Sequence, residues 1–195
     1  MKRQEIKFLI QDKDLSKLKK KYQFETLYKP RIIKTLYFDT YNFKFFRQSE
    51  EGLTPRLKVR MRGYNEGDIN NFEIKKTNSY HREKITVKNF TYSLPKLNKL
   101  VKNYDIFENL SEKLLVVYNR YYFSIKEIGR ITVDENIKFF TPKSNYELPF
   151  RINDKVLEVK IEKNIIDKFD VEKKINLRES RFSKYCSGVN SAYNI

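Results

Sequence analysis

The stretch that decides the fold is RLKVRMR, residues 56–62. Positive charges occupy every second position, namely Arg56, Lys58, Arg60 and Arg62. Apolar residues fill the positions between them, namely Leu57, Val59 and Met61. Because successive side chains of a β-strand point to opposite faces, this strand has one apolar face and one strongly cationic face. Four adjacent cations repel one another, so we expect anionic groups to lie beside them.

The same alternation recurs along the chain. The charged positions of the other expected strands are Arg3, Glu5, Lys7, Glu73, Lys75, Arg82, Lys84, Arg120, Arg130, Asp134, Glu158, Lys160 and Glu162. Residues such as Ile6, Ile74 and Val159 alternate with them. In addition, Tyr118 shares the parity of Arg120. Several expected strands therefore share the same pattern, with one charged face and one apolar face.

Periodicity predicts mostly strands joined by short turns, with a few helices. Strands are expected over residues 3–10, 34–40, 54–64, 69–77, 81–88, 113–125, 129–140 and 154–162. Helices are expected over residues 12–22, 93–104, 164–177 and 181–188, the second of them capped by Ser93. Gly129 marks a turn between two long strands. The chain of 195 residues is expected to form one domain over residues 1–195.

An alternating pattern has two readings. An antiparallel sheet with one wet face alternates in the same way, and its charges are then solvated surface pairs worth roughly 0–1 kcal/mol each. In the other reading, helices cover the apolar face and the charged face turns inward. About eight strands then close into a barrel whose interior holds side chains or one small ligand. Cations around such an interior need a polyanion among them.

Arginine usage favours the second reading. The chain has 12 Arg and 29 Lys, and seven of the 12 Arg lie on the charged strand face. The planar guanidinium matches phosphate oxygens at two points at once, which an ammonium cannot do. We therefore predict an α+β, mainly β fold: a closed, antiparallel, roughly eight-stranded tunnel barrel with a charged interior and helices packed outside.

Composition limits the chemistry. The formal net charge of +16 points to an anionic partner. The single histidine, His81, excludes a histidine-rich metal site and a Ser-His-Asp triad. The five glycines form neither a P-loop nor a dinucleotide fingerprint, so phosphate must be held by side chains. One cysteine, Cys186, fits a reducing compartment, and with neither a signal peptide nor a membrane span expected, we predict a cytoplasmic protein.

Eight fragments, in order, resemble one family. EIKF, LYFDT, RLKVRMRGY, FEIKK, YNRYYF, GRITVD, VLEVK and the terminal FSKY..G are similar to the triphosphate tunnel metalloenzymes of the CYTH-like superfamily, and within them to the VTC domain, which polymerises polyphosphate. Hydrolytic and cyclase members open with a Glu-x-Glu-x-Lys strand. Here those positions are Arg3, Glu5 and Lys7, and the missing first glutamate favours the VTC branch.

The resemblance implies a role for each matching residue. Phosphate-binding residues are expected to be Lys7, Lys58, Arg60, Arg62, Lys75, Lys84, Tyr118, Arg120, Arg130, Ser183 and Lys184. Of these, Lys75, Arg60, Arg62 and Lys184 are the expected catalytic residues. Glu158 is the expected ligand of Mn²⁺ or Mg²⁺, and Glu5 a weaker one.

The implied function is a polyphosphate polymerase-like phosphotransferase, which moves the γ-phosphate of ATP to a phosphate or polyphosphate acceptor with a divalent metal. Two alternatives stay open: an inorganic triphosphatase or polyphosphatase of the same fold, and a non-catalytic module that binds polyanions. The expected partners are a nucleoside triphosphate and phosphate or polyphosphate. Sequence-specific nucleic-acid binding is not expected, since no recognition motif is present. The sequence names no protein or membrane partner.

Overall fold

A computed structural model of the chain describes residues 3–79, 81–147, 149–162 and 167–195, without the side chains of Arg3, Gln4 and Glu162. Its strands are β1 (Arg3–Ile10), β2 (Glu25–Thr40), β3 (Arg56–Tyr64), β4 (Asn71–Thr77), β5 (Arg82–Val87), β6 (Leu110–Ile125), β7 (Gly129–Phe140), β8 (Phe150–Arg151) and β9 (Lys155–Glu162). Its α-helices are α1 (Asp12–Lys21), α2 (Lys44–Glu50), α3 (Leu94–Lys102), α4 (Lys168–Ile175) and α5 (Lys184–Tyr193), and a 3₁₀ turn spans Pro142–Ser144.

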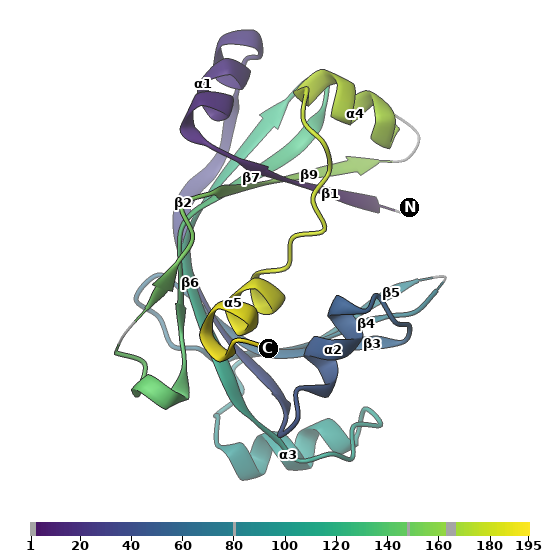
Figure 1. Cartoon of the computed structure of the whole chain (residues 1–195), viewed down its shortest axis with the longest axis vertical. Coiled ribbons are helices and arrows are strands. Elements are labelled where there is room, and N and C mark those ends of the chain that lie inside the picture. The colour runs from purple at the N-terminus through teal and green to yellow at the C-terminus, as the bar shows by residue number, and fades with distance from the viewer. Residues whose placement is uncertain (1–2, 80, 148, 163–166) are drawn as a thin grey trace. The chain divides into compact units, whose positions relative to one another are not determined.

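The strands form one mainly antiparallel sheet in the order β1-β9-β7-β6-β2-β3-β4-β5, with β8 beside β7. The predicted fold class, mainly β with a small number of helices, is confirmed (Figure 1). Within the described residues, the order ends at β1 and β5, so hydrogen bonds do not close the sheet between these two strands. The chain divides into two compact units, and the long strands β2 and β6 contribute to both.

The first unit comprises Met1–Ile32, Tyr118–Lys138 and Arg151–Ser183. Its core joins the apolar faces of β1, β7 and β9 to one stripe of each neighbouring helix. Leu18 of α1 and Val171 and Ile175 of α4 pack with residues such as Phe8 and Val159. The helices therefore cover the apolar face, and the charged positions of these strands lie on the opposite face, as predicted.

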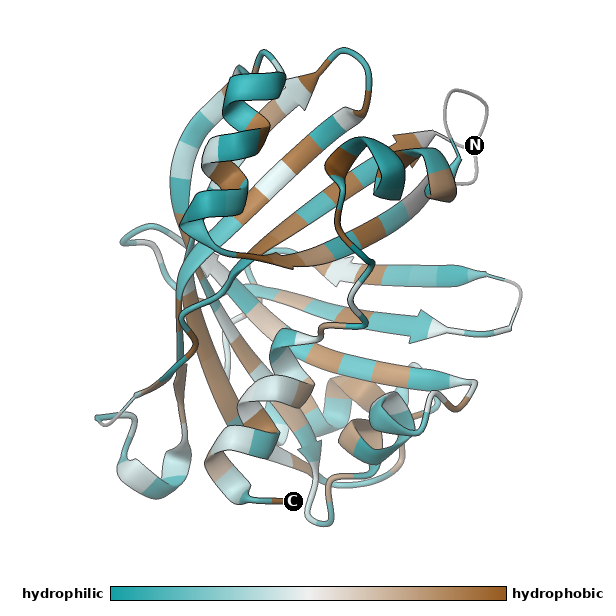
Figure 2. Ribbon diagram, turned by 45° about the horizontal axis from the view of Figure 1, so that its top comes forward, coloured by the Kyte–Doolittle hydropathy of each residue, from teal (hydrophilic) through white to brown (hydrophobic). Residues whose placement is uncertain are grey.

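The second unit comprises Ile33–Val117, Phe139–Phe150 and Lys184–Ile195. Val59 of β3 and Ile74 of β4 pack against Leu97 and Val101 of α3. Ser93 caps α3 as predicted, since its side chain accepts a hydrogen bond from the backbone N–H of Lys96. Bands of hydrophilic and hydrophobic residues alternate along the strands in Figure 2.

Helix α5 differs from the other helices of the second unit, because it packs on the face that carries the charges. Its Tyr185 stacks on Tyr37 of β2, which neighbours Arg60. Gly188 lies in the middle of α5, where a Cβ atom would come within 2.4 Å of Leu114 and 2.6 Å of Phe139. Glycine is therefore required for this close approach of helix and sheet.

Two predicted boundaries were wrong and one helix was not predicted, each for a physical reason. The strand expected over residues 34–40 begins at Glu25, because its first eight residues are all exposed and so carry no apolar alternation. Helix α2 was not predicted, since it is short, its N-cap residue Phe43 provides no side-chain cap, and its first-turn N–H groups donate to Asp39 on β2 instead. Helix α5 continues past Gly188 to Tyr193, because this glycine serves packing and does not end the helix.

The helix predicted over residues 164–177 is confirmed as α4 over Lys168–Ile175, and its first residues lie outside the part that the structure describes. Gly129 has a φ of +119° and opens β7 after the predicted turn. No helix among the described residues is both long and apolar enough to cross a bilayer.

Candidate functional site

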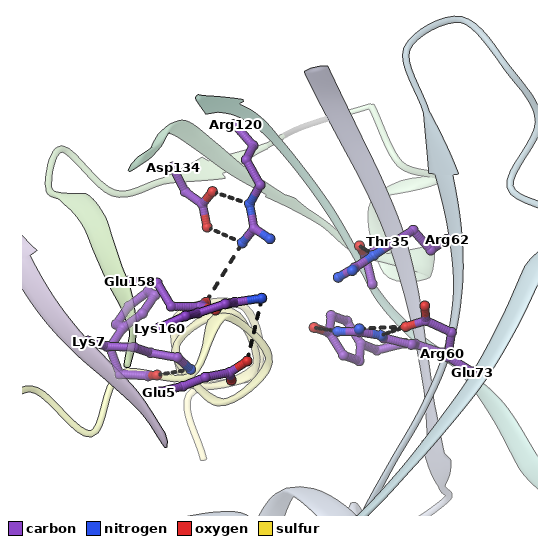
Figure 3. Close-up of polar contacts among 12 residues, drawn as sticks. Glu5, Lys7, Thr35, Arg60, Arg62, Glu73, Arg120, Asp134, Glu158 and Lys160 are labelled. Atoms are coloured by element: carbon purple, nitrogen blue, oxygen red, sulfur yellow. Dashed lines mark hydrogen bonds and ion pairs between the residues drawn. The ribbon is translucent and has the colours of Figure 1, made fainter. Parts of the chain in front are cut away.

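The predicted site residues fall into two groups, one in each unit, and each group is held by its own strands (Figure 3). We call the first the Glu158 cluster, made of Glu5, Lys7, Arg120, Asp134, Glu158 and Lys160. We call the second the Arg60 cluster, made of Thr35, Tyr37, Arg60, Arg62, Glu73 and Lys84. Each cluster alternates positive and negative or hydroxyl groups across neighbouring strands.

Strand register places Glu158 at the centre of its cluster. Glu158 on β9 lies opposite Lys7 on β1 and opposite Thr132 on β7. Its side chain is buried, and its oxygens lie 3.9 Å from Nη2 of Arg120 and 3.7 Å from Nζ of Lys160. Both distances exceed a hydrogen bond, so neither cation is hydrogen-bonded to the carboxylate oxygens.

The charges around Glu158 keep it ionised. Burial raises the pKa of this carboxyl and so does Asp134, but Arg120, Lys7 and Lys160 outweigh them and the pKa is lowered. A deprotonated, buried carboxylate is what a hard divalent cation requires as a ligand.

Arg120 is committed to a different carboxylate. Its Nε donates to Oδ1 of Asp134 at 2.6 Å and its Nη2 to Oδ2 at 2.7 Å. The guanidinium carbon lies 5.4 Å from the centre of the Tyr118 ring, which confirms that these two residues share a face. This fork against Asp134, with help from Tyr118 and Glu158, raises the pKa of Arg120 despite its burial. Arg120 is thus a fixed positive charge beside Glu158.

Two further lysines complete the Glu158 cluster. Nζ of Lys160 lies 3.6 Å from Glu5, so one ammonium lies near both predicted metal ligands. Nζ of Lys7 donates to the backbone oxygen of Phe182 at 3.1 Å, and its own carbonyl accepts from the N–H of Ser180 at 2.7 Å. The segment that leads to Ser183 is therefore tied to β1.

The Glu158 cluster offers few side-chain ligands for a divalent metal. Among the residues that the structure describes, no three His, Cys, Asp or Glu side chains gather as a metal site. Glu158 with Glu5 supplies at most two carboxylates, and Asp134 is occupied by Arg120. Mg²⁺ is commonly held in this way, by one or two carboxylates together with waters and the phosphates of a substrate. The residues present fit a metal that binds together with phosphate.

In the Arg60 cluster, a buried carboxylate pairs with two cations. Glu73 on β4 lies opposite Arg60 on β3, and its Oε2 accepts from Nε of Arg60 at 2.7 Å. Its Oε1 lies 2.5 Å from Nζ of Lys84 on β5. The side chains of Arg60 and Glu73 are only 8% and 3% exposed, so they do not belong to a solvated face. Glu73 is thus the anion that lets neighbouring cations share one face.

Arg62 is arranged differently from Arg60. Its Nε donates to the hydroxyl of Thr35, the residue opposite it on β2, at 3.3 Å. Among the described residues, its two terminal nitrogens make neither a hydrogen bond nor an ion pair. A half-buried guanidinium oriented at Nε and open at both Nη atoms is suited to a bidentate contact with phosphate oxygens.

The remaining predicted residues are placed as follows. Lys58 and Lys75 face each other across β3 and β4 and are half-buried. Arg130 is exposed and lies opposite Lys160. Ser183 precedes α5 and Lys184 begins it, both half-buried. The side chains of Arg3 and Glu162, which share the charged parity, lie outside the described part.

Sequence reasoning missed three residues of β2, namely Thr35, Tyr37 and Asp39. All three are buried, and they share a face opposite Leu36 and Phe38. Their alternation with Leu36 and Phe38 was visible in KTLYFDT, residues 34–40, but no pattern of charged residues marked it. The strand register, which pairs Tyr37 with Arg60, gives these residues their significance.

We predict that Glu73→Gln lowers stability by about 3–5 kcal/mol, because it leaves the buried Arg60 without its counter-ion. In the folded protein, burial raises the pKa of Glu73, but Arg60, Lys84 and Arg62 lower it to about 2. Since this folded pKa is below the unfolded one, Glu73 stabilises the fold above about pH 4.5, and this contribution is lost as the pH falls toward 2. Urea unfolding at pH 7 and pH 3 measures both effects. If Glu73→Gln lowers the free energy of unfolding equally at pH 7 and pH 3, the explanation from the charge of Glu73 is contradicted.

Solved structures share this architecture over nearly the whole chain. A putative adenylyl cyclase from Hippeastrum, described as having a dominant triphosphatase activity, is similar with a TM-score of 0.59 at 14% identity, covering 98% of this chain and 96% of that one. The PH1819 protein of Pyrococcus horikoshii OT3 has a TM-score of 0.54 at 15% identity, covering 97% and 99%. A putative adenylate cyclase from Vibrio parahaemolyticus has a TM-score of 0.52 at 13% identity, covering 93% and 94%. The chain thus has the fold of these proteins.

Within that fold class, the sequence identifies the branch. The family model of the VTC domain matches residues 2–193. The chain belongs to the VTC domain family, as the order of its fragments predicted. No curated protein matches the chain.

Proposed function

We propose that this protein is a polyphosphate polymerase-like phosphotransferase, which moves the γ-phosphate of ATP to phosphate or polyphosphate. An oxygen of the acceptor forms a bond to the γ-phosphorus, the bond from that phosphorus to the bridging β–γ oxygen breaks, and ADP leaves. The acceptor is one phosphate longer after each cycle. Phosphoryl transfer of this kind depends on positioning and on neutralising charge more than on covalent chemistry by the protein.

The observation that carries the proposal is the open fork of Arg62 beside the buried Arg60–Glu73 pair, which the exposed Lys84 joins. In this assignment, Arg60, Arg62, Lys75 and Lys184 stabilise the transferred group. Lys7, Lys58, Lys84, Tyr118, Arg120, Arg130 and Ser183 bind the other phosphates. The Glu73 carboxylate accepts a hydrogen bond from Nε of Arg60, whereas Nε of Arg62 donates to Thr35.

Glu158, with Glu5 as the weaker ligand, would hold the divalent cation, Mn²⁺ or Mg²⁺. When bound, such a cation supplies charge neutralisation at the phosphate oxygens. Arg120 and Lys160 supply positive charges beside the Glu158 carboxylate. The proposal needs no strong general base, which agrees with the single histidine, His81. A cytoplasmic location stays a prediction from the single cysteine.

The test is incubation of the purified protein with ATP and Mn²⁺, followed by a gel stained for polyanions. We expect acid-labile polyphosphate chains whose length increases with time. Release of phosphate without chains would replace the proposal by a triphosphatase, the activity described for the Hippeastrum protein. Tight binding of polyphosphate with neither product would replace it by a polyanion-binding module.

A further inference from the structure

Tyr37 lies between the arginines of β3 and helix α5. It is directly opposite Arg60 in the register of β2 and β3, and its side chain is buried. Nη1 of Arg60 donates to its hydroxyl oxygen at 3.5 Å. On the α5 side, its ring stacks on Tyr185, with the centroids 4.9 Å apart and the planes 26° from parallel. The phenol is thus fixed in place from two directions.

The ring of Tyr185 is itself anchored. Its hydroxyl donates to Oδ2 of Asp39 at 2.6 Å. Asp39 is fully buried and also accepts from the backbone N–H groups of Phe45 and Phe46, both at 2.9 Å. The hydroxyl of Tyr185 is therefore occupied, and only its ring contacts Tyr37. Because Lys184 precedes Tyr185 on α5, this stack also locates the first residue of the helix.

The charges that act on the Tyr37 phenol come from one strand. Burial raises the pKa of Tyr37, but Arg60, Arg62 and Lys58 of β3 outweigh it and bring the pKa to about 8. From β4, Glu73 lies on the other side of the Arg60 guanidinium and is paired with it. From α5, Tyr185 is neutral, since burial and Asp39 raise its pKa.

We propose that Tyr37 is a positioning residue for Arg60, and that its phenol is an ionisable counter-charge that competes with phosphate for the positive charge of Arg60 and Arg62. The proposal rests on the proposed function, because it takes phosphate as the ligand of the arginines. The neutral phenol leaves the charge of the pair available to phosphate. The phenolate places an anion beside Nη1 of Arg60 and reduces that charge.

Two linked effects follow. Affinity for phosphate chains falls as the pH rises through about 8, since Tyr37 then ionises. Conversely, a bound phosphate chain partly neutralises the same arginines, so they stabilise the phenolate less. Binding of the chain therefore raises the pKa of Tyr37, and the size of this effect equals the effect of ionisation on binding. A residue with a purely structural role would show neither effect.

The first measurement is the absorbance of tyrosinate near 295 nm during a pH titration of the folded protein without ligand or metal. We expect one of the 14 tyrosines to titrate near pH 8, and this step to be absent in Tyr37→Phe. Tyr41→Phe is the matched control, because Tyr41 is 91% exposed, and it should retain the step. If Tyr37→Phe keeps the step near pH 8, the ionisable counter-charge is refuted.

The second measurement is calorimetric binding of tripolyphosphate, without metal and at one salt concentration, at pH 7 and pH 9.5. We expect the affinity of the wild type to fall about 10-fold relative to that of Tyr37→Phe over this range. Tripolyphosphate should also raise the pH of the 295 nm step. Equal pH dependence in the two proteins would overturn the competition with phosphate, even if the step near pH 8 is assigned to Tyr37.

The two proposals fail in different ways. If the wild type does not bind tripolyphosphate at pH 7, the proposed function fails and the competition fails with it. If it binds and makes polyphosphate but shows no coupling to Tyr37, only the inference about Tyr37 fails.

Discussion

Glu158→Gln is expected to reduce turnover with ATP and Mn²⁺ by at least about 100-fold, the scale of losses when a metal site is perturbed. The substitution keeps the size of the side chain and removes the buried, ionised carboxylate. The fold should survive, because each neighbouring cation keeps another partner. Arg120 stays paired with Asp134, and Lys160 stays near Glu5.

Glu158→Gln should not weaken the binding of polyphosphate when no metal is present. Removing one negative charge beside Arg120, Lys7 and Lys160 makes the local potential more positive. The affinity for polyphosphate without metal should therefore hold steady or rise while turnover collapses. Both quantities are measured at one fixed salt concentration, because polyanion affinity falls steeply with salt.

Glu135→Gln is the matched control for this change. Glu135 belongs to the same unit and pairs with Lys155, away from the Glu158 cluster. It should retain near-parental turnover. A folded Glu158→Gln protein that turns over at the parental rate would refute the metal assignment, and Glu158 would then be only an ion-pair partner of Arg120 and Lys160.

Arg62→Lys is expected to lower kcat/KM by about 100-fold, equivalent to about 3 kcal/mol, although the charge is unchanged. The structure gives the reason: Thr35 orients Nε of Arg62, and no residue in the described part of the chain occupies its two terminal nitrogens, which can make a bidentate contact. An ammonium provides no such fork. Arg62→Lys and Arg62→Gln should therefore be similarly impaired, whereas a purely electrostatic role would leave the lysine variant nearly active.

Two comparisons sharpen this experiment. Arg47→Lys on α2 is the control, because Arg47 is exposed and belongs to the same unit. Arg60→Lys is a poorer probe, because Arg60 is buried against Glu73 and its replacement also affects stability. Single-turnover rates and urea unfolding of each variant separate the two effects. Full activity of Arg62→Lys would return this residue to the role of a general surface charge.

The alternation in β3 was enough to predict which side chains share a face. Val59 and Met61 are in the core, and Arg60 and Arg62 are on the other face, because the period of two is a property of the strand itself. The same reasoning placed Glu158 on the charged face of β9. Family membership also followed from sequence, since eight fragments in order carried it.

The pairing of those charges could not be predicted from sequence. Whether Glu73 is a solvated ion-pair partner or the buried counter-ion of Arg60 depends on the register between β3 and β4 and on what covers the face. Similarly, the fork of Arg120 is committed to Asp134, while that of Arg62 is open, although both arginines appear equivalent in an alternating pattern.

The sequence by itself determined the strands, the two faces and the family, because these depend on local periodicity and on the order of fragments along the chain. Only the tertiary structure decided that α5 packs on the charged face, that Tyr37 lies between Arg60 and Tyr185, and that Asp39 anchors both α2 and α5. The hydrogen bond from Tyr185 to Asp39, for example, joins residues 146 positions apart. No local pattern encodes such a contact, since its energy comes from burial and geometry that exist only once distant segments have packed together.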